Sequence, residues 1–255
     1  MRFKRQPEDI LKALGIYEPE DIDLDLIAFS LGAEVKRASL SDCEGNIIGT
    51  DTKAIITINN NVNLSRQRFS LGHELGHWIN DRRKNLTYRC NTNDMGQFSI
   101  KKNNFRQNKE VRANQFSAKL MMPTHICLKY LRKQDITIET AKYLANEFQT
   151  SVTSAAIRLI EVSDQPCMLI CWASDGKRRW FTRNSIIPDE IWPHERIMNL
   201  QNIPINLNGI EAEADKWISS DGAEDYMVVE SLFNNGFDYL TLIWWKDESQ
   251  LIKMV

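Results

Sequence analysis

Two histidines and a glutamate in the first third of the chain have the spacing of a metal-binding helix. His73 and His77 enclose Glu74 in the pattern His-Glu-x-x-His. Four residues make about one helical turn, so both imidazoles lie on one helix face and can reach a single metal ion. This arrangement suits zinc, which in catalytic sites takes three protein ligands and leaves a position for water. Glu74 is placed to accept the proton of that water, so the pattern predicts hydrolytic zinc chemistry.

The neighbouring residues predict the helix that must carry this motif. Ser65 is the expected N-cap, which places the motif in the middle of the helix. Phe69, Leu75 and Trp78 are then available for the core. Before this helix we expect two short helices and a small sheet whose last strand forms the edge along which an extended peptide is laid. The expected helices are 7–14 and 24–31, and the expected strands are 33–37, 45–49 and 54–58.

A second helix supplies a candidate for the third metal ligand. The segment 110–123 has a strong helical pattern and ends at Pro123. Glu110 and Asn114 are one turn apart, so a carboxylate and an amide point the same way. Two histidines and a glutamate form a known catalytic zinc set, and we take Glu110 as the ligand and Asn114 as a group that orients a ligand or the bound peptide. The alternative for Glu110 is a glutamate that merely favours the helix start.

The segment 81–109, between the two motifs, is polar and basic. It carries eight lysines and arginines against Asp81 and Asp94, whereas the rest of the chain has an excess of acidic residues. One interpretation is a lid or collar that attracts an acidic partner surface or nucleic acid. The other is a solvated insertion without a partner, because such a loop needs no function to be soluble.

The two motifs together resemble the ImmA/IrrE family of zinc metallo-endopeptidases. The family patterns are RF-x-x-x-HELGH and E-x-x-A-N-x-F-A-x-x-LLMP, and this chain has RFSLGHELGH over 68–77 and EVRANQFSAKLMMP over 110–123. Ser117 replaces an alanine of the family pattern, Met121 stands in its leucine run, and the segment between the motifs is longer. With weaker matches on either side, the resemblance covers about residues 7–163.

The resemblance implies a gluzincin-like fold in which His73, His77 and Glu110 bind zinc and Glu74 is the general base. It also implies a cytoplasmic endopeptidase of narrow specificity that cleaves a helix-turn-helix repressor, often in a stress regulon or on a mobile element, to relieve repression. Some relatives belong to toxin–antitoxin systems. The alternative from another class is a regulator that binds its partner in the same cleft without cutting it, with a structural metal. Candidates for stabilising the oxyanion are Tyr88, Tyr130 and His125, the last of which follows Pro123 closely enough to line the cleft.

The second half of the chain predicts a helical segment and a separate α+β module. Two amphipathic helices with a short connection, over 137–161, have the form of a helix-turn-helix. Their basic residues are offset by glutamates, so we expect a packing role, and the alternative is a regulator that binds DNA directly through these helices. After Pro166, two hairpins enclose an expected helix over 210–218, and some relatives carry a GAF-like sensor domain at this place.

These observations give the expected fold class and organisation. We expect an α+β protein with a mainly helical zincin-like metallopeptidase domain that includes a small N-terminal sheet, a helix-turn-helix-like segment and an antiparallel α+β module, possibly GAF-like. The expected domains are 1–125, 126–163 and 164–255. No apolar run approaches the roughly 18 residues of a spanning helix, and the N-terminus is too polar for a signal peptide, so we expect a cytoplasmic protein without a membrane partner.

Overall fold

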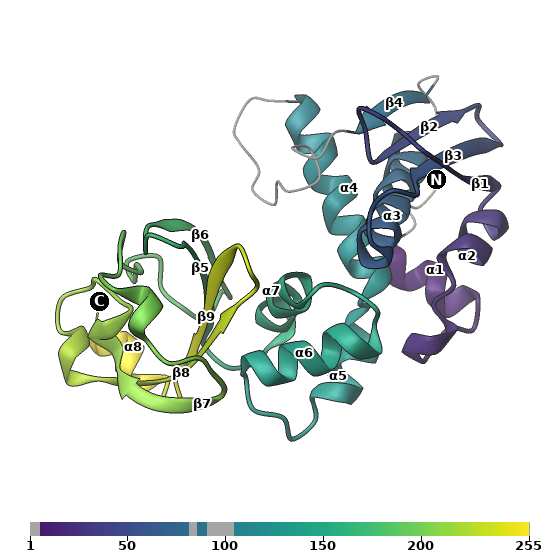
Figure 1. Ribbon diagram of the computed structural model, residues 1–255. Helices are drawn as coiled ribbons and strands as arrows, with labels where there is room; N and C mark the ends of the chain where they lie inside the picture. Colours follow the sequence, from purple (N-terminus) through teal and green to yellow (C-terminus); the bar gives the residue numbers. More distant parts are fainter. Residues whose placement is uncertain (1–5, 82–85, 91–104, 255) are drawn as a thin grey trace. The chain divides into compact units, whose positions relative to one another are not determined.

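The computed structural model describes the backbone of residues 6–81, 86–90 and 105–254, and the side chains of residues 6–81 and 109–254 (Figure 1). The chain divides into two compact units, each described by itself. The first comprises Met1–Lys129 and Asn146–Ser151, and the second comprises Tyr130–Ala145 and Val152–Val255. The three-part division expected from the sequence stays a prediction.

The first unit begins with the short helices expected from the sequence. Their cap residues explain where they start: Pro7 occupies the first turn of α1, and Asp23 Oδ1 accepts hydrogen bonds from the backbone nitrogens of Asp25 and Leu26, at 2.9 and 3.0 Å. Leu24, Ile27 and Ala28 are buried. The elements are α1 (Pro7–Ala13), the 3₁₀ helix η1 (Pro19–Asp21) and α2 (Leu24–Ser30).

A four-stranded sheet follows, in the order β1-β3-β2-β4. The third strand was expected at the edge, and this is wrong. Ile56 of β3 pairs with Val35 in parallel and with Ile47 in antiparallel, so both sides of β3 are occupied. The edges are β1 and a strand from the segment that the sequence indicated to be a loop. The strands are β1 (Ala33–Ala38), β2 (Gly45–Gly49), β3 (Ala54–Asn59) and β4 (Leu86–Cys90).

Helix α3 (Leu64–Asp81) packs against β2 and β3 and carries the His-Glu-x-x-His motif (Figure 1). Phe69, Leu75 and Trp78 are buried, as predicted. The N-cap is Asn63, not Ser65, because Asn63 Oδ1 accepts a hydrogen bond from the backbone nitrogen of Arg66 at 2.9 Å. The helix therefore starts one residue before the expected cap.

Helices α4 to α7 follow along the chain. The helix that carries the second motif is longer than expected, because it begins at Phe105. The helix pair expected over 137–161 is confirmed, and Gln149 in its connection has a positive φ of 51°, which turns the chain between the helices. The elements are α4 (Phe105–Met121), α5 (Thr124–Leu131), α6 (Ile138–Glu147) and α7 (Val152–Val162).

The second unit contains an antiparallel five-stranded sheet in the order β6-β5-β9-β8-β7. One face of the sheet packs on a core that includes Met168, Trp172, Trp217 and Trp245. This confirms the antiparallel α+β module. Its elements are β5 (Cys167–Ala173), β6 (Arg178–Arg183), η4 (Leu200–Asn202), β7 (Asn206–Glu213), η5 (Ala214–Lys216), η6 (Ala223–Asp225), β8 (Met227–Asn234), β9 (Asp238–Trp244) and α8 (Ser249–Lys253).

The helix expected over 210–218 is wrong. Strand β7 continues to Glu213, with Ile210 opposite Glu230 and Glu213 opposite Met227 of β8. The next three residues form the 3₁₀ helix η5. The sequence Ile210-Glu-Ala-Glu-Ala214 alternates apolar and charged residues, and this period of two belongs to a strand. Among the described residues, no helix has the length and apolar character needed to cross a membrane.

Candidate metal centre

Helix α3 holds both histidines of the motif on one buried face. The side chains of His73 and His77 are fully buried, and their Nε2 atoms lie 3.0 Å apart. The rings meet edge to face, with centroids 4.7 Å apart. One turn of helix is sufficient to produce this pairing, so it depends little on the rest of the fold.

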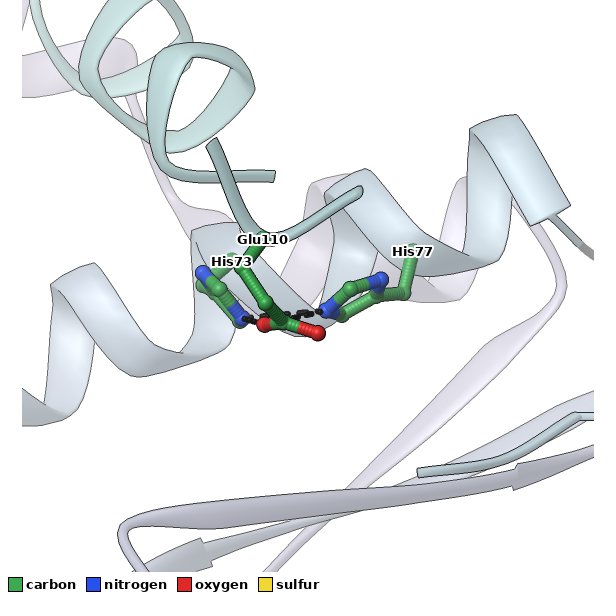
Figure 2. A group of neighbouring side chains, drawn as sticks. All are labelled: His73, His77 and Glu110. Atoms are coloured by element: carbon green, nitrogen blue, oxygen red, sulfur yellow. Dashed lines mark hydrogen bonds and ion pairs between the residues drawn. The ribbon is translucent and has the colours of Figure 1, made fainter. Parts of the chain in front are cut away.

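Helix α4 adds a carboxylate to the two imidazoles. Glu110 Oε2 lies 3.1 Å from His73 Nε2 and 3.2 Å from His77 Nε2 (Figure 2). In the described residues, these three side chains form the one group of histidines, cysteines and carboxylates whose ligand atoms lie close enough to hold a metal ion, all within 4.8 Å of one another. Because α4 starts at Phe105, Glu110 is in the second turn, where the helix dipole gives a glutamate little stabilisation. A position at the helix start therefore does not account for this residue.

Two glycines of α3 let the second helix approach. An added Cβ at Gly72 would lie 2.5 Å from Ser117 Oγ, and one at Gly76 would lie 3.0 Å from Ala113 Cα. Ser117 also donates a hydrogen bond to the backbone oxygen of Phe69 at 2.8 Å, which ties the two helices together. The small residues thus set the helix separation that brings Glu110 to the histidines.

A side-chain oxygen atom from another residue faces Nδ1 of each imidazole. Asn114 Oδ1 lies 2.8 Å from His73 Nδ1, and an amide oxygen only accepts, so Nδ1 carries the proton and the lone pair of Nε2 faces Glu110. On the other ring, Asp81 Oδ2 lies 3.6 Å from His77 Nδ1. The sequence interpretation named Asn114 and missed Asp81. The signal was present, because Asp81 follows His77 by one helical turn.

The electrostatics of the group favour a cation at its centre. Burial alone lowers the pKa of His77, but Asp81, Glu110 and Glu74 outweigh it and raise that pKa to about 9. Burial raises the pKa of Glu110, yet the two histidines hold it well below its usual range. Burial likewise raises the pKa of Asp81, and His77, Lys109 and Arg112 outweigh it and lower that pKa. The charges are therefore arranged to keep the carboxylates ionised around a positive centre.

The donor set fits zinc. Tetrahedral zinc with bonds of 2.0–2.1 Å separates its nitrogen and oxygen ligands by about 3.3 Å. The three separations here, 3.0–3.2 Å, are close to that value. Two imidazole nitrogens and a carboxylate oxygen that converge in this way also repel one another unless a cation or proton lies between them. His73, His77 and Glu110 are thus the residues that could hold the metal.

Glu74, the candidate general base, is fully buried and lies against strand β2. An added Cβ at Gly45 would lie 3.0 Å from Glu74 Oε1 and 3.2 Å from Glu74 Cγ. The glycine at the start of β2 therefore leaves the space that the carboxylate occupies. Any larger residue at this position would displace Glu74.

A half-buried ion pair next to Gly45 was also missed by sequence reasoning. Glu44, directly before Gly45, accepts hydrogen bonds from Arg66 Nε and, at 3.3 Å, from Ser70 Oγ. Arg66 and Ser70 lie on α3 one turn apart, towards the N-terminus from His73. The spacing of Arg66 and Ser70 was readable from the sequence, but the partner Glu44 lies on a strand end that only the fold brings there.

The remaining predicted site residues lie as follows. His125, on α5, has Nδ1 4.0 Å from Glu8 Oε2 and its ring edge to face with Tyr17, at 6.3 Å between centroids. The ring of Tyr130 lies 6.1 Å from that of Tyr143. Tyr88 pairs with Ile47 in the sheet, and its side chain lies outside the described residues. Most of the basic segment over 81–109 also lies outside them, so its role stays a prediction.

A family model described as the IrrE N-terminal-like domain, in a peptidase family, matches residues 20–160, which is more than half of the chain. The chain belongs to the IrrE N-terminal-like peptidase family. This confirms the resemblance read from the motifs. The IrrE-like region contains α3 and α4 with all three candidate ligands, so its site is of the metallopeptidase type.

Comparison with other proteins adds a likeness in fold. No curated protein matches the IrrE-like chain. A solved structure of a Mycobacterium tuberculosis transcriptional regulator is similar, with a TM-score of 0.55 and 12% identity over 98% of this chain and 89% of that chain. At this identity, the likeness shows the fold alone.

Proposed function

We propose that this protein is a zinc-dependent endopeptidase of narrow specificity that cleaves a helix-turn-helix transcriptional repressor or an antitoxin in the cytoplasm. The observation that carries the proposal is the convergence of the Nε2 atoms of His73 and His77 and Oε2 of Glu110, 3.0–3.2 Å from one another. Glu74 is buried on α3, the helix of the two histidines. Family membership supports peptide hydrolysis as the chemistry. The class of substrate rests on the family resemblance of the two motifs.

The residues divide the work of hydrolysis. His73, His77 and Glu110 would hold the zinc, which when bound supplies a Lewis acid for a water molecule and the scissile carbonyl. The Glu74 carboxylate accepts the proton of the attacking water and returns it to the leaving amine. The contact with Asn114 keeps the proton of His73 on Nδ1, so that Nε2 remains a ligand.

The sheet offers a place for the substrate backbone. Strand β4 is the edge strand next to β2, and β2 passes Glu74 at Gly45. An extended peptide that pairs with an edge strand gains backbone hydrogen bonds without regard to its side chains. We therefore assign β4, in place of β3, as the strand along which the peptide lies.

The test is Glu74→Gln, which keeps the size of the side chain and removes its basicity. We expect the variant to retain zinc and to lose about 10²–10⁴-fold in the rate of cleavage. Purified protein is incubated with repressors encoded beside its gene, and products are identified by mass spectrometry, with zinc measured by elemental analysis. If Glu74→Gln cuts as fast as wild type, Glu74 is not the base. If both proteins bind a repressor and neither cuts it, the protein is a non-catalytic regulator.

A further inference from the structure

Asp81 is the last residue of α3, an unfavourable position for a carboxylate. The C-terminal end of a helix carries partial negative charge, which disfavours an acidic residue there by about 0.3–1 kcal/mol. Asp81 is also 6% exposed, so it gains little from water. A buried acid at this helix end requires compensating partners, and they identify its role.

The first partner is a candidate metal ligand. Asp81 Oδ2 lies 3.6 Å from Nδ1 of His77, on the side of the ring opposite to Glu110. Asn114 occupies the corresponding place on His73, at 2.8 Å. An oxygen atom therefore lies behind each ring: the amide of Asn114 on α4 hydrogen-bonds to His73, and the carboxylate of Asp81 on α3 lies 3.6 Å from His77.

The second partner lies on the other helix. Arg112 Nη2 is 3.8 Å from Asp81 Oδ1, and Arg112 follows Glu110 by two residues on α4. The carboxylate thus stands between an imidazole of α3 and a guanidinium of α4. This contact joins the end of α3 to the part of α4 that carries the third candidate ligand.

We propose that Asp81 is a positioning residue for the metal centre: its carboxylate, 3.6 Å from His77 Nδ1, favours the proton on Nδ1 and so leaves Nε2 to face Glu110, with Arg112 on the other side of the carboxylate. The inference rests on the proposed metal centre. A carboxylate behind a ligating histidine fixes its tautomer and orientation, and loss of such a partner costs about 10–100-fold in metal affinity. The chain thus has the extended motif His-x-x-x-Asp at 77–81 as part of the site.

The experiment compares zinc affinity in full-length variants by competition with a chelator. We expect Asp81→Ala to weaken zinc binding by about 10–100-fold. Asp81→Asn keeps an oxygen acceptor and should lose less, and it guards against a folding defect because it conserves shape. Glu147→Gln is the matched control, since Glu147 is the last residue of α6, and it should bind zinc as wild type does.

A spectroscopic signature separates positioning from a general loss of structure. We expect the visible bands of cobalt-substituted Asp81→Ala to shift relative to wild type, because the orientation of His77 changes, those of Asp81→Asn to shift less, and those of Glu147→Gln to stay. If Asp81→Ala binds zinc as tightly as wild type with an unchanged cobalt spectrum, while His73→Ala loses the metal, the role of Asp81 is refuted and the metal centre stands. If wild type itself binds no zinc, both are refuted.

Discussion

Both units of this protein bury charged side chains, but in opposite ways. In the second unit, Glu230 is 3% exposed and accepts hydrogen bonds from Lys216 Nζ and Trp217 Nε1. In the first unit, Glu110 meets two imidazole nitrogens at 3.1 and 3.2 Å, and those nitrogens lie 3.0 Å from each other. Glu230, in the second unit, is surrounded by hydrogen-bond donors, whereas Glu110, in the first, converges with two imidazole nitrogens on one position.

This difference separates a structural polar group from a candidate functional one. A buried carboxylate surrounded by donors is satisfied by the protein itself. Acceptors that converge need a metal cation or a proton between them, so the site of the first unit is stable only when one of these is bound. Burial of charge alone would not have distinguished the two places.

The largest expected effects come from replacing the two glutamates, because each substitution should change a property that the other leaves unchanged. Glu110→Ala should abolish zinc binding and with it the zinc-linked stabilisation, which is about 4 kcal/mol at a thousandfold excess over Kd. Glu230→Ala should leave zinc content unchanged and lower the free energy of unfolding of the second unit by about 3 kcal/mol, because it leaves a buried donor and a cation without their partner.

Elemental analysis and denaturant titrations measure the two effects. Six of the seven tryptophans lie in the second unit, so their fluorescence follows that unit, whereas Trp78 belongs to the first. Zinc that survives Glu110→Ala, or zinc lost in Glu230→Ala, would contradict the contrast between the two sites.

A second prediction concerns pH in the metal-free protein. The folded-state pKa of His77, about 9, is above the ordinary histidine value of 6.5, so its protonation stabilises the fold. This contribution, about 3 kcal/mol, is fully present below pH 6.5 and is lost as pH rises through 9. Denaturant titrations followed by circular dichroism at pH 6 and 9.5 measure it.

The variant His77→Ala provides the control for this pH effect. It should remove most of the pH dependence of unfolding in this range. Saturating zinc should also suppress it, because the metal takes the place of the proton on His77. A metal-free wild-type protein that is equally stable at both pH values would show that His77 is not protonated in the fold.

The smallest expected effect comes from two glycines. At Gly76 an added Cβ would meet Ala113 Cα at 3.0 Å and Phe116 Cβ at 3.1 Å. Overpacking costs about 1–3 kcal/mol, and the better helix propensity of alanine returns up to about 1 kcal/mol. Gly76→Ala should therefore destabilise the first unit by about 1–2 kcal/mol and weaken zinc binding, because Glu110 is displaced with α4.

Gly236→Ala is the matched change in the second unit. Gly236 has a φ of +93° and no atom within 4 Å of an added Cβ, so only backbone strain of about 1 kcal/mol is expected. Zinc affinity should be unchanged. Equal effects of both substitutions on zinc binding would show that the separation of α3 and α4 does not control the site.

Errors in the sequence interpretation have specific physical causes. The residues 210–214 have the period of a strand, although a helix is predicted there from the sequence. The prediction that β3 is an edge strand fails because β1, from earlier in the chain, pairs with it in parallel. Asn63 and Ser65 are both good caps, and only the observed hydrogen bond decides between them. Strand β4 lies in a segment whose polar composition indicated a loop.

The sequence by itself determined the His73–His77 pair, the family and the α+β class. The pair follows from local spacing, because one helical turn fixes which side chains share a face. The family follows from the residues of the two motifs, and the class from the helical and strand patterns along the chain. Only the tertiary structure decided that Glu110 joins the histidines and that Asp81 and Asn114 stand behind them, and that Glu44 pairs with Arg66. Those contacts depend on how closely α4 and β2 approach α3. The close approach is possible because Gly72, Gly76 and Gly45 have no side chain at the points of contact.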